Sequence, residues 1–147
     1  MNIENKIKGL YGKGTKESFD NLLELEAISE QADTVYPYFN EFLAMLKSEK
    51  YLFRVRGFRL ICKLAKWDKD NLIDEALEDV LVLLHDEKPT AIRQALGYLK
   101  YLITYKEPLK GRIREEALAI DLSEFKDSMR PLIEKDIGEL VRLIDGE

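Results

Sequence analysis

The sequence is poor in the residues that most often form a catalytic or metal-binding centre. Among 147 residues there is one cysteine, Cys62, and one histidine, His85. A single cysteine excludes an internal disulfide, and a metal centre of the zinc type needs several ligands at short spacing. Cys62 also lacks a partner base that would activate it as a nucleophile. We therefore predict no catalytic residue, no metal and no cofactor, and a protein that is not an enzyme.

Long apolar runs and phosphate-binding loops are missing as well. No segment approaches the ~18 consecutive apolar residues that a transmembrane helix needs. The first residues, Met1 to Lys6, lack the apolar stretch of a signal peptide. Gly12 and Gly14 follow neither the P-loop nor the dinucleotide pattern. With one thiol on an apolar helix face, these absences predict a cytoplasmic protein without membrane contact.

The apolar pattern predicts helices and no strands. No stretch alternates with a period of two, whereas apolar residues recur at helical spacing throughout. Each of the four prolines falls in the first turn of a predicted helix, where its missing amide costs no hydrogen bond. The predicted fold class is all-α, with about eight helices. They are expected near residues 3–10, 15–31, 36–46, 51–67, 73–84, 89–105, 108–120 and 126–144.

The apolar periodicity within these helices predicts which side chains lie in the core. Residues 51–67 place apolar side chains on one face and basic ones on another, and residues 73–84 place an apolar stripe opposite an acidic face. The acidic face has no histidine or cysteine at ligand spacing, so we read it as solvated or partner-facing. The expected core positions are Val55, Phe58, Ile61, Cys62 and Ala65; Ile73, Ala76, Leu77, Val80, Leu81 and Leu84; and, in residues 15–31, Phe19, Leu22, Leu23 and Ala27.

A pair made of an aliphatic residue and an arginine recurs every 37 residues. Each pair lies near the start of a helix that follows an apolar helix and a short polar turn. A period of this length, built from helix pairs, is the signature of an α-solenoid, in which each pair buries its apolar face against its neighbours. The three pairs are Val55-Arg56, Ile92-Arg93 and Met129-Arg130.

These pairs, together with Asp86 in the turn of the middle unit, resemble the HEAT-repeat family over roughly residues 33–144. The resemblance implies a right-handed α-α superhelix of antiparallel helix pairs. It also implies that the turn aspartate bonds the helix arginine, so Asp86 is expected to pair with Arg93. The first unit departs from the pattern, with Ser48 and Glu49 where the aspartate is expected. In the third unit, Asp121 and Asp127 are both candidates for the turn aspartate.

The repeat defines the expected domain organisation. We predict a single HEAT-like domain over residues 1–147. Capping helices occupy residues 1–32, and three helix pairs occupy residues 33–68, 69–105 and 106–147.

Charge is segregated along the chain. Residues 47–69 carry eight basic and two acidic side chains, residues 70–87 carry seven acidic and no basic ones, and residues 88–114 carry seven basic and one acidic. In a HEAT-like stack the second helix of each pair lines the concave surface, which implies a basic groove and an acidic outer wall. The alternative is that opposite charges neutralise one another across adjacent helices, as on ordinary solvated faces.

The basic side chains of the groove are the candidate partner-binding residues: Arg56, Arg59, Lys63, Arg93 and Lys100. The repeat spacing favours a structural role for Arg56 and Arg93, which leaves Arg59, Lys63 and Lys100 as the stronger candidates. Tyr98 and Tyr101 are expected in the core, because the 37-residue register places them opposite Ile61 and Leu64. Trp67 is expected to cover the edge of its unit.

The function predicted from this pattern is a non-enzymatic scaffold that binds an acidic segment of a partner protein. The alternative is a nucleic-acid binder or a relative of the HEAT-like DNA glycosylases, in which Trp67 and Asp68 would take part. The net charge of −5 argues against nucleic acid, whose binding domains are usually basic.

Overall fold

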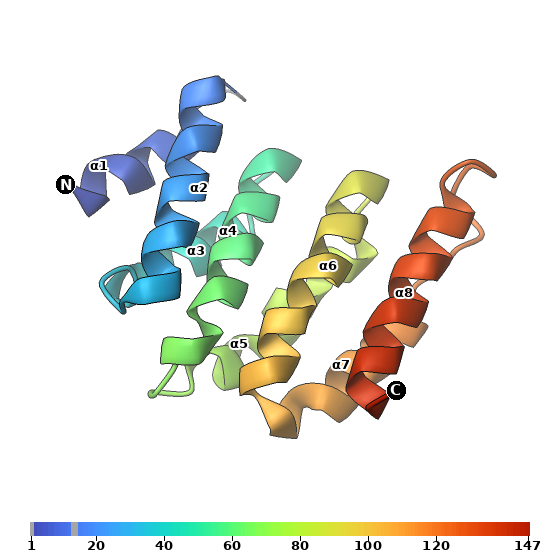
Figure 1. The fold of residues 1–147 in the computed structure, drawn as a ribbon. Helices are drawn as coiled ribbons and strands as arrows, with labels where there is room; N and C mark the ends of the chain where they lie inside the picture. The colour runs from blue at the N-terminus through green and yellow to red at the C-terminus, as the bar shows by residue number, and fades with distance from the viewer. Residues whose placement is uncertain (1, 13–14) are drawn as a thin grey trace.

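The front of the molecule is a row of four helices that lie side by side, and shorter helices lie behind them (Figure 1). We describe this arrangement from a computed structural model, which places residues 2–12 and 15–147. Consecutive front helices contact one another, α3 packs against α4, and α7 packs against α8. The front helices are α2 (Lys16–Gln31), α4 (Tyr51–Lys63), α6 (Pro89–Tyr105) and α8 (Arg130–Asp145). Those behind are α3 (Phe39–Met45), α5 (Leu72–Leu81) and α7 (Lys110–Leu118), and α1 (Ile3–Lys8) lies beside α2 at the N-terminal end of the row.

The described residues contain these eight α-helices and no strand, which confirms the all-α prediction. Several helices end or begin in short 3₁₀ turns, which extend them by a few residues. The predicted right-handed superhelical arrangement of helix pairs stays a prediction. The 3₁₀ turns are η1 (Gly9–Tyr11), η2 (Tyr36–Tyr38), η3 (Leu64–Trp67), η4 (Val82–His85) and η5 (Glu107–Leu109).

The last helix begins later than its apolar pattern suggests. The sequence predicts its start near Lys126, but α8 begins at Arg130, and residues 126–129 form a turn in which the Met129 amide bonds the Lys126 carbonyl. Pro131 lies in the first turn of α8. A proline at this position leaves no helical amide unpaired, which favours a helix start there.

The predicted core faces of α4 and α5 are confirmed. Every apolar position expected on α4 and its 3₁₀ extension is buried, and the stripe of α5 is buried except for Ala76, which is half-buried. Burial raises the pKa of the Cys62 thiol, so this cysteine is neutral and unreactive at neutral pH. One cluster of buried apolar side chains continues from Ile7 in α1 to Leu140 in α8.

The predicted inner face of α2 is wrong at three of its four positions. Phe19 and Leu23 are 47% and 42% exposed, and Ala27 is exposed as well. The face that packs inward is partly polar, because two of its polar side chains make buried hydrogen bonds or ion pairs, which apolar periodicity does not detect. Its buried members are Ser18, Leu22, Leu25, Glu26 and Ser29.

Gly57 allows α3 and α4 to pack closely. A Cβ at this position would lie 2.6 Å from the Phe42 carbonyl oxygen and 2.8 Å from Met45 Cβ. Backbone cannot move aside as a flexible side chain can, so the added methyl group would push the two helices apart. A side chain is therefore excluded here by the neighbouring helix.

We expect Gly57→Ala to lower the free energy of unfolding by about 1–3 kcal/mol, the usual result of overpacking a core. Gly97→Ala is the matched control, because no heavy atom lies within 4 Å of a Cβ at Gly97 on α6. It should raise stability by roughly 0.5–1 kcal/mol through helix propensity alone. Urea denaturation of both variants tests this, and a stable Gly57→Ala protein would contradict the close packing of α3 on α4.

None of the helices in the described part of the chain combines the length and the apolar character required to cross a bilayer.

Candidate functional site

Polar contacts join each helix pair to the next, and they differ from the pairing predicted by the repeat. Asp86 does not bond Arg93; it accepts hydrogen bonds from Arg54, at 2.8 Å from Nε and 3.2 Å from Nη2. Arg93 instead donates to Asp136 of α8, at 2.6 Å. Arg54 lies two residues before Arg56, the first of the three arginines that recur every 37 residues, which we call the arginine ladder. Arg54 also donates to the Ser48 carbonyl of its own turn. The expected Asp86–Arg93 bond is therefore wrong, although Asp86 does join two units.

The three arginines of the ladder have three different sets of partners. Arg56 is buried and donates to the Leu10 and Gly12 carbonyls, which fixes the N-terminal turn against α4. Burial lowers the pKa of Arg56. Arg130 donates to two carbonyls of the loop before its own helix. Arg56 and Arg130 thus bond backbone, and Arg93 bonds a neighbouring carboxylate.

Asp68 lies at the centre of a buried network that joins three units. Its side chain is fully buried, and it accepts hydrogen bonds from the Tyr36 hydroxyl at 2.6 Å and from the Leu72 and Ile73 amides at 2.9 Å. Lys106, also buried, lies 2.9 Å from the same carboxylate. These bonds cap the start of α5 and hold α6 against it. The carboxylate has no free position for a substrate, which removes the main support for a glycosylase-like role.

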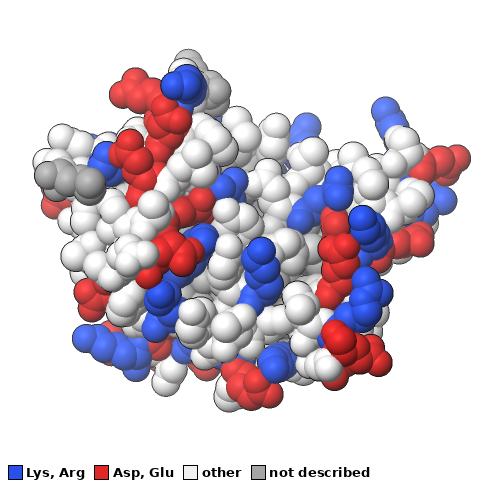
Figure 2. All heavy atoms as spheres, in the orientation of Figure 1, with Lys and Arg blue, Asp and Glu red and all other residues white. Residues whose placement is uncertain are grey.

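The front face holds the strongest candidate surface. Arg59 of α4 forms a two-pronged ion pair with Glu26 of α2, at 3.0 and 2.8 Å, and donates to Gln94 of α6 at 3.1 Å. Lys63, one turn further, pairs with Glu30 of α2. Figure 2 shows basic and acidic side chains next to one another over this part of the front face. The two predicted cations are therefore largely neutralised, as the alternative interpretation of the charge blocks proposed.

Aromatic rings lie between these cations. The Arg59 guanidinium stacks 4.7 Å from the Tyr98 ring centroid and 5.9 Å from that of Phe19. The Lys63 ammonium lies 4.1 Å from the Tyr101 ring. Tyr98 and Tyr101 are half-buried, with ring centroids 5.5 Å apart, so they form part of the surface rather than the interior core that was predicted for them.

Burial and charge set the ionisation of this group. Burial by itself would lower the pKa values of Arg59 and Lys63, but their hydrogen bonds to Glu26 and Glu30 raise both pKa values overall. Burial, together with the Glu26 charge, raises the pKa of Tyr98. All three side chains therefore keep one ionisation state across the physiological range: Arg59 and Lys63 charged, and Tyr98 neutral.

Lys100 is the predicted cation that remains available on this face. It is exposed and stacks 5.2 Å from the Tyr101 ring, and no carboxylate among the described residues lies within ion-pair distance of it. Tyr98 and Tyr101 thus bring Arg59, Lys63 and Lys100 together, as the sequence predicts, across α4 and α6. We call Phe19, Arg59, Lys63, Tyr98, Lys100 and Tyr101 the aromatic-cation strip.

The strip ends in a hollow between α6 and α8. This hollow has a volume of about 480 Å³ and is lined by Lys100, Tyr101, Tyr105 and Leu143, among others. Tyr105 and Leu143 are 51% and 54% exposed. Adjacent exposed aromatic and apolar side chains are typical of a protein-binding surface.

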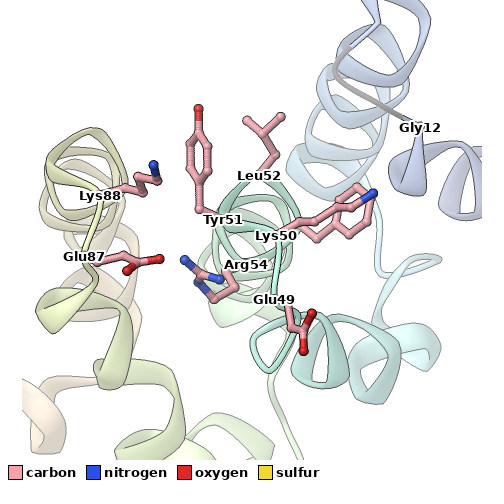
Figure 3. A pocket seen from close by; sticks show the side chains of 9 residues that line it. Gly12, Glu49, Lys50, Tyr51, Leu52, Arg54, Glu87 and Lys88 are labelled. Carbon is pink, nitrogen blue, oxygen red and sulfur yellow. The ribbon is translucent and has the colours of Figure 1, made fainter.

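A second pocket lies at the opposite end of α4 and α6 (Figure 3). It has a volume of about 360 Å³, and its lining includes Tyr51, Leu52 and Phe53. Lys50 and Lys88, the residues that precede α4 and α6, lie at its rim. Sequence reasoning did not find this pocket, because its lining comes from three segments that are distant in the chain: Gly12, residues 49–54 and residues 87–88.

The outer acidic residues are also partly neutralised. Glu78 of α5 forms a two-pronged ion pair with Arg112 of α7, at 2.9 and 2.7 Å, and Asp74 lies 2.7 Å from Lys106. His85 contacts Glu116 across the same interface. The Trp67 indole donates to the Ser29 carbonyl at 2.6 Å, which confirms its predicted role in covering the edge of its unit.

The comparisons with known proteins identify no relative: no family model, no curated protein and no solved structure matches the chain.

Proposed function

We propose that the protein is a non-enzymatic interaction module, of the HEAT-like kind, whose front face binds an acidic segment of a partner protein. The observation that carries this proposal is the aromatic-cation strip, which crosses three successive helices and ends beside exposed Tyr105 and Leu143. Aromatic residues and arginine are enriched in the energetically important centres of protein interfaces. A partner segment with an apolar side chain for the hollow and a carboxylate for Lys100 fits this surface.

The charge of the strip supports an acidic partner over a basic one. Glu26 and Glu30 are already bonded to Arg59 and Lys63, and Lys66 donates to the Glu30 carbonyl at 2.8 Å. The remaining positive charge of the face is concentrated at Lys66 and Lys100. An incoming carboxylate gains a charge-assisted hydrogen bond there without breaking an existing ion pair. Of the five predicted partner-binding residues, Lys100 is therefore central, Arg59 and Lys63 support the surface, and Arg56 and Arg93 position the units.

Single-stranded nucleic acid is the second candidate, because stacked aromatic rings between cations also bind unpaired bases. Glu26 and Glu30 lie beside the strip, paired with Arg59 and Lys63, and their charges oppose a phosphate backbone, so we place this candidate second. A fluorescein-labelled oligothymidine distinguishes the two. Binding whose affinity falls steeply with added salt would favour nucleic acid, because neutralised phosphates release counterions.

We expect Lys100→Glu to weaken binding of acidic-apolar peptides about tenfold, by replacing a charge-assisted bond with repulsion. The peptides would come from a phage-displayed random library selected on the immobilised protein. Lys126→Glu is the matched control: it makes the same charge change at an exposed residue in the loop before α8. Selection of basic peptides, or equal loss in both variants, would contradict an acidic partner at this face.

We further propose a reducing, cytoplasmic setting, since the one cysteine is buried and free.

A further inference from the structure

We propose that the pocket between the starts of α4 and α6 is a binding site for a small apolar carboxylate, of the size of a medium-chain fatty acid. This inference is independent of the proposed partner-binding face, because the pocket lies at the opposite ends of these helices from Lys100. Its volume of about 360 Å³ falls within the range of small-molecule sites. Its three consecutive apolar residues, Tyr51, Leu52 and Phe53, provide the surface for a hydrocarbon group.

The apolar part of the pocket is exposed to solvent. Leu52 is 37% exposed, and Figure 3 shows the Tyr51 and Leu52 side chains standing side by side and pointing in the same direction. Phe53 is held beneath Tyr11, whose ring meets it edge-on with centroids 5.3 Å apart. This contact helps to hold the Phe53 ring, and the pocket is present without a ligand.

Two lysines give the pocket its preference for an anion. The Lys88 ammonium lies 5.5 Å from the Tyr51 ring centroid, and the Lys50 ammonium lies 5.4 Å from that of Phe53. Neither lysine forms an ion pair with a carboxylate in the part of the chain that the structure describes. Each therefore lies beside an apolar ring with its charge unmatched, where a ligand carboxylate can bind it.

The helix starts add to this preference, although acidic residues also lie near them. Lys50 and Lys88 occupy the N-cap positions of α4 and α6, and neither side chain caps its helix, so the positive ends of two parallel helix dipoles face the same rim. At the start of α6 the Asp86 carboxylate accepts a hydrogen bond from the Lys88 amide at 3.0 Å. Of the two lining glutamates, Glu87 points toward Arg54 and Glu49 points away from Tyr51 and Leu52 (Figure 3). The Arg54 charge itself is matched by Asp86.

Titration with sodium octanoate, followed by amide chemical shifts in two-dimensional NMR, tests this site. We expect the amides of residues 49–54 and 87–90 to shift, and octylamine, which has the same chain with the opposite charge, to leave them unmoved. The double variant Lys50→Gln, Lys88→Gln should bind octanoate about tenfold more weakly, as expected for the loss of bonds to charged groups. Lys47→Gln with Lys69→Gln is the matched control, because both lysines are exposed and lie outside the pocket.

A test of the apolar contribution completes the experiment. Leu52→Asn, at a partly exposed position, should weaken octanoate and 1-octanol equally, whereas the double lysine variant should weaken only octanoate. Shifts spread over the whole chain, an octylamine affinity equal to that of octanoate, or a double lysine variant with unchanged affinity would each overturn the proposal. The variants leave Lys100 and the hollow intact, so their peptide binding at the front face is expected to be unchanged.

Discussion

Asp68→Ala is expected to lower the free energy of unfolding by about 3–5 kcal/mol, as is usual when one partner of a buried ion pair is removed. The substitution removes the fully buried carboxylate that pairs with Lys106 and leaves its ammonium only the partly exposed Asp74 carboxylate, at 2.7 Å. It also leaves the Leu72 and Ile73 amides and the Tyr36 hydroxyl without their acceptor. Urea denaturation monitored by circular dichroism measures the loss. Asp70→Ala, at the exposed residue two positions on, is the control and should change stability by less than about 0.5 kcal/mol.

The effect of Asp68 should also depend on pH in a defined direction. Burial alone would raise the pKa of Asp68, but hydrogen bonds from Tyr36, the Ile73 amide and Lys106 outweigh burial and lower it. A carboxylate with a lowered folded-state pKa stabilises the protein above its unfolded-state pKa, about 3.9, and this contribution is lost as the pH falls through the folded-state value.

The isosteric variant Asp68→Asn isolates this contribution. Other carboxylates with lowered pKa values, such as Glu30 and Glu116, titrate in both proteins and cancel in the comparison. The difference in unfolding free energy between wild type and Asp68→Asn should therefore be constant from neutral pH to about pH 5 and should shrink below about pH 4. A difference that does not change with pH would show that the Asp68 charge is not stabilised by its neighbours.

The features that were predicted correctly from the sequence are those that depend on one helix at a time. The apolar stripe of α5 predicts burial correctly, because every residue in the stripe contacts the same core. Proline positions mark helix starts for a local reason, because a proline in the first turn costs no helical hydrogen bond. In α2 the apolar pattern of the helix itself does not predict which face is buried. Glu26 and Ser29 are buried because of groups on α4 and in η3, and nothing in α2 itself records those partners.

The pairing of charges depends on which residues of different helices meet, and the repeat gave the wrong register for it. Arg54, Arg59 and Lys63 each bond a carboxylate 32 or 33 residues away, whereas the arginine ladder has a period of 37. The sequence does contain opposite charges at the shorter offset of 32 or 33 residues. The 37-residue spacing of the arginines, however, predicts a different pairing. The hollow beside Lys100 has no sequence signal, because Tyr105 and Leu143 meet only when α6 and α8 pack together.

Arg59→Ala is expected to be far more destabilising than Arg93→Ala, the reverse of the order that the repeat alone predicts. The sequence places Arg93 in the structural ladder and Arg59 on an open stripe. In the structure, the Arg59 and Glu26 side chains are 12% and 7% exposed, whereas that of Arg93 is 37% exposed. Removing Arg59 leaves a nearly buried Glu26 charge unpaired, which costs about 3 kcal/mol, at the lower end of the range for buried pairs. Removing Arg93 breaks a solvent-screened pair with Asp136, which is worth at most about 1 kcal/mol.

Chemical denaturation of both variants decides the order, and a double variant shows its cause. Arg59→Met combined with Glu26→Met removes both charges and keeps apolar volume at the contact between α2 and α4. Because no charge is then left buried without a partner, the double variant should recover most of the stability lost in Arg59→Ala. If Glu26→Met adds a further loss to that of Arg59→Met, the Glu26 carboxylate stabilises α2 independently of Arg59. If Arg59→Ala and Arg93→Ala cost the same, the Arg59–Glu26 pair is as exposed to solvent as the Arg93–Asp136 pair, and the front face is looser than the contacts between α2, α4 and α6 imply.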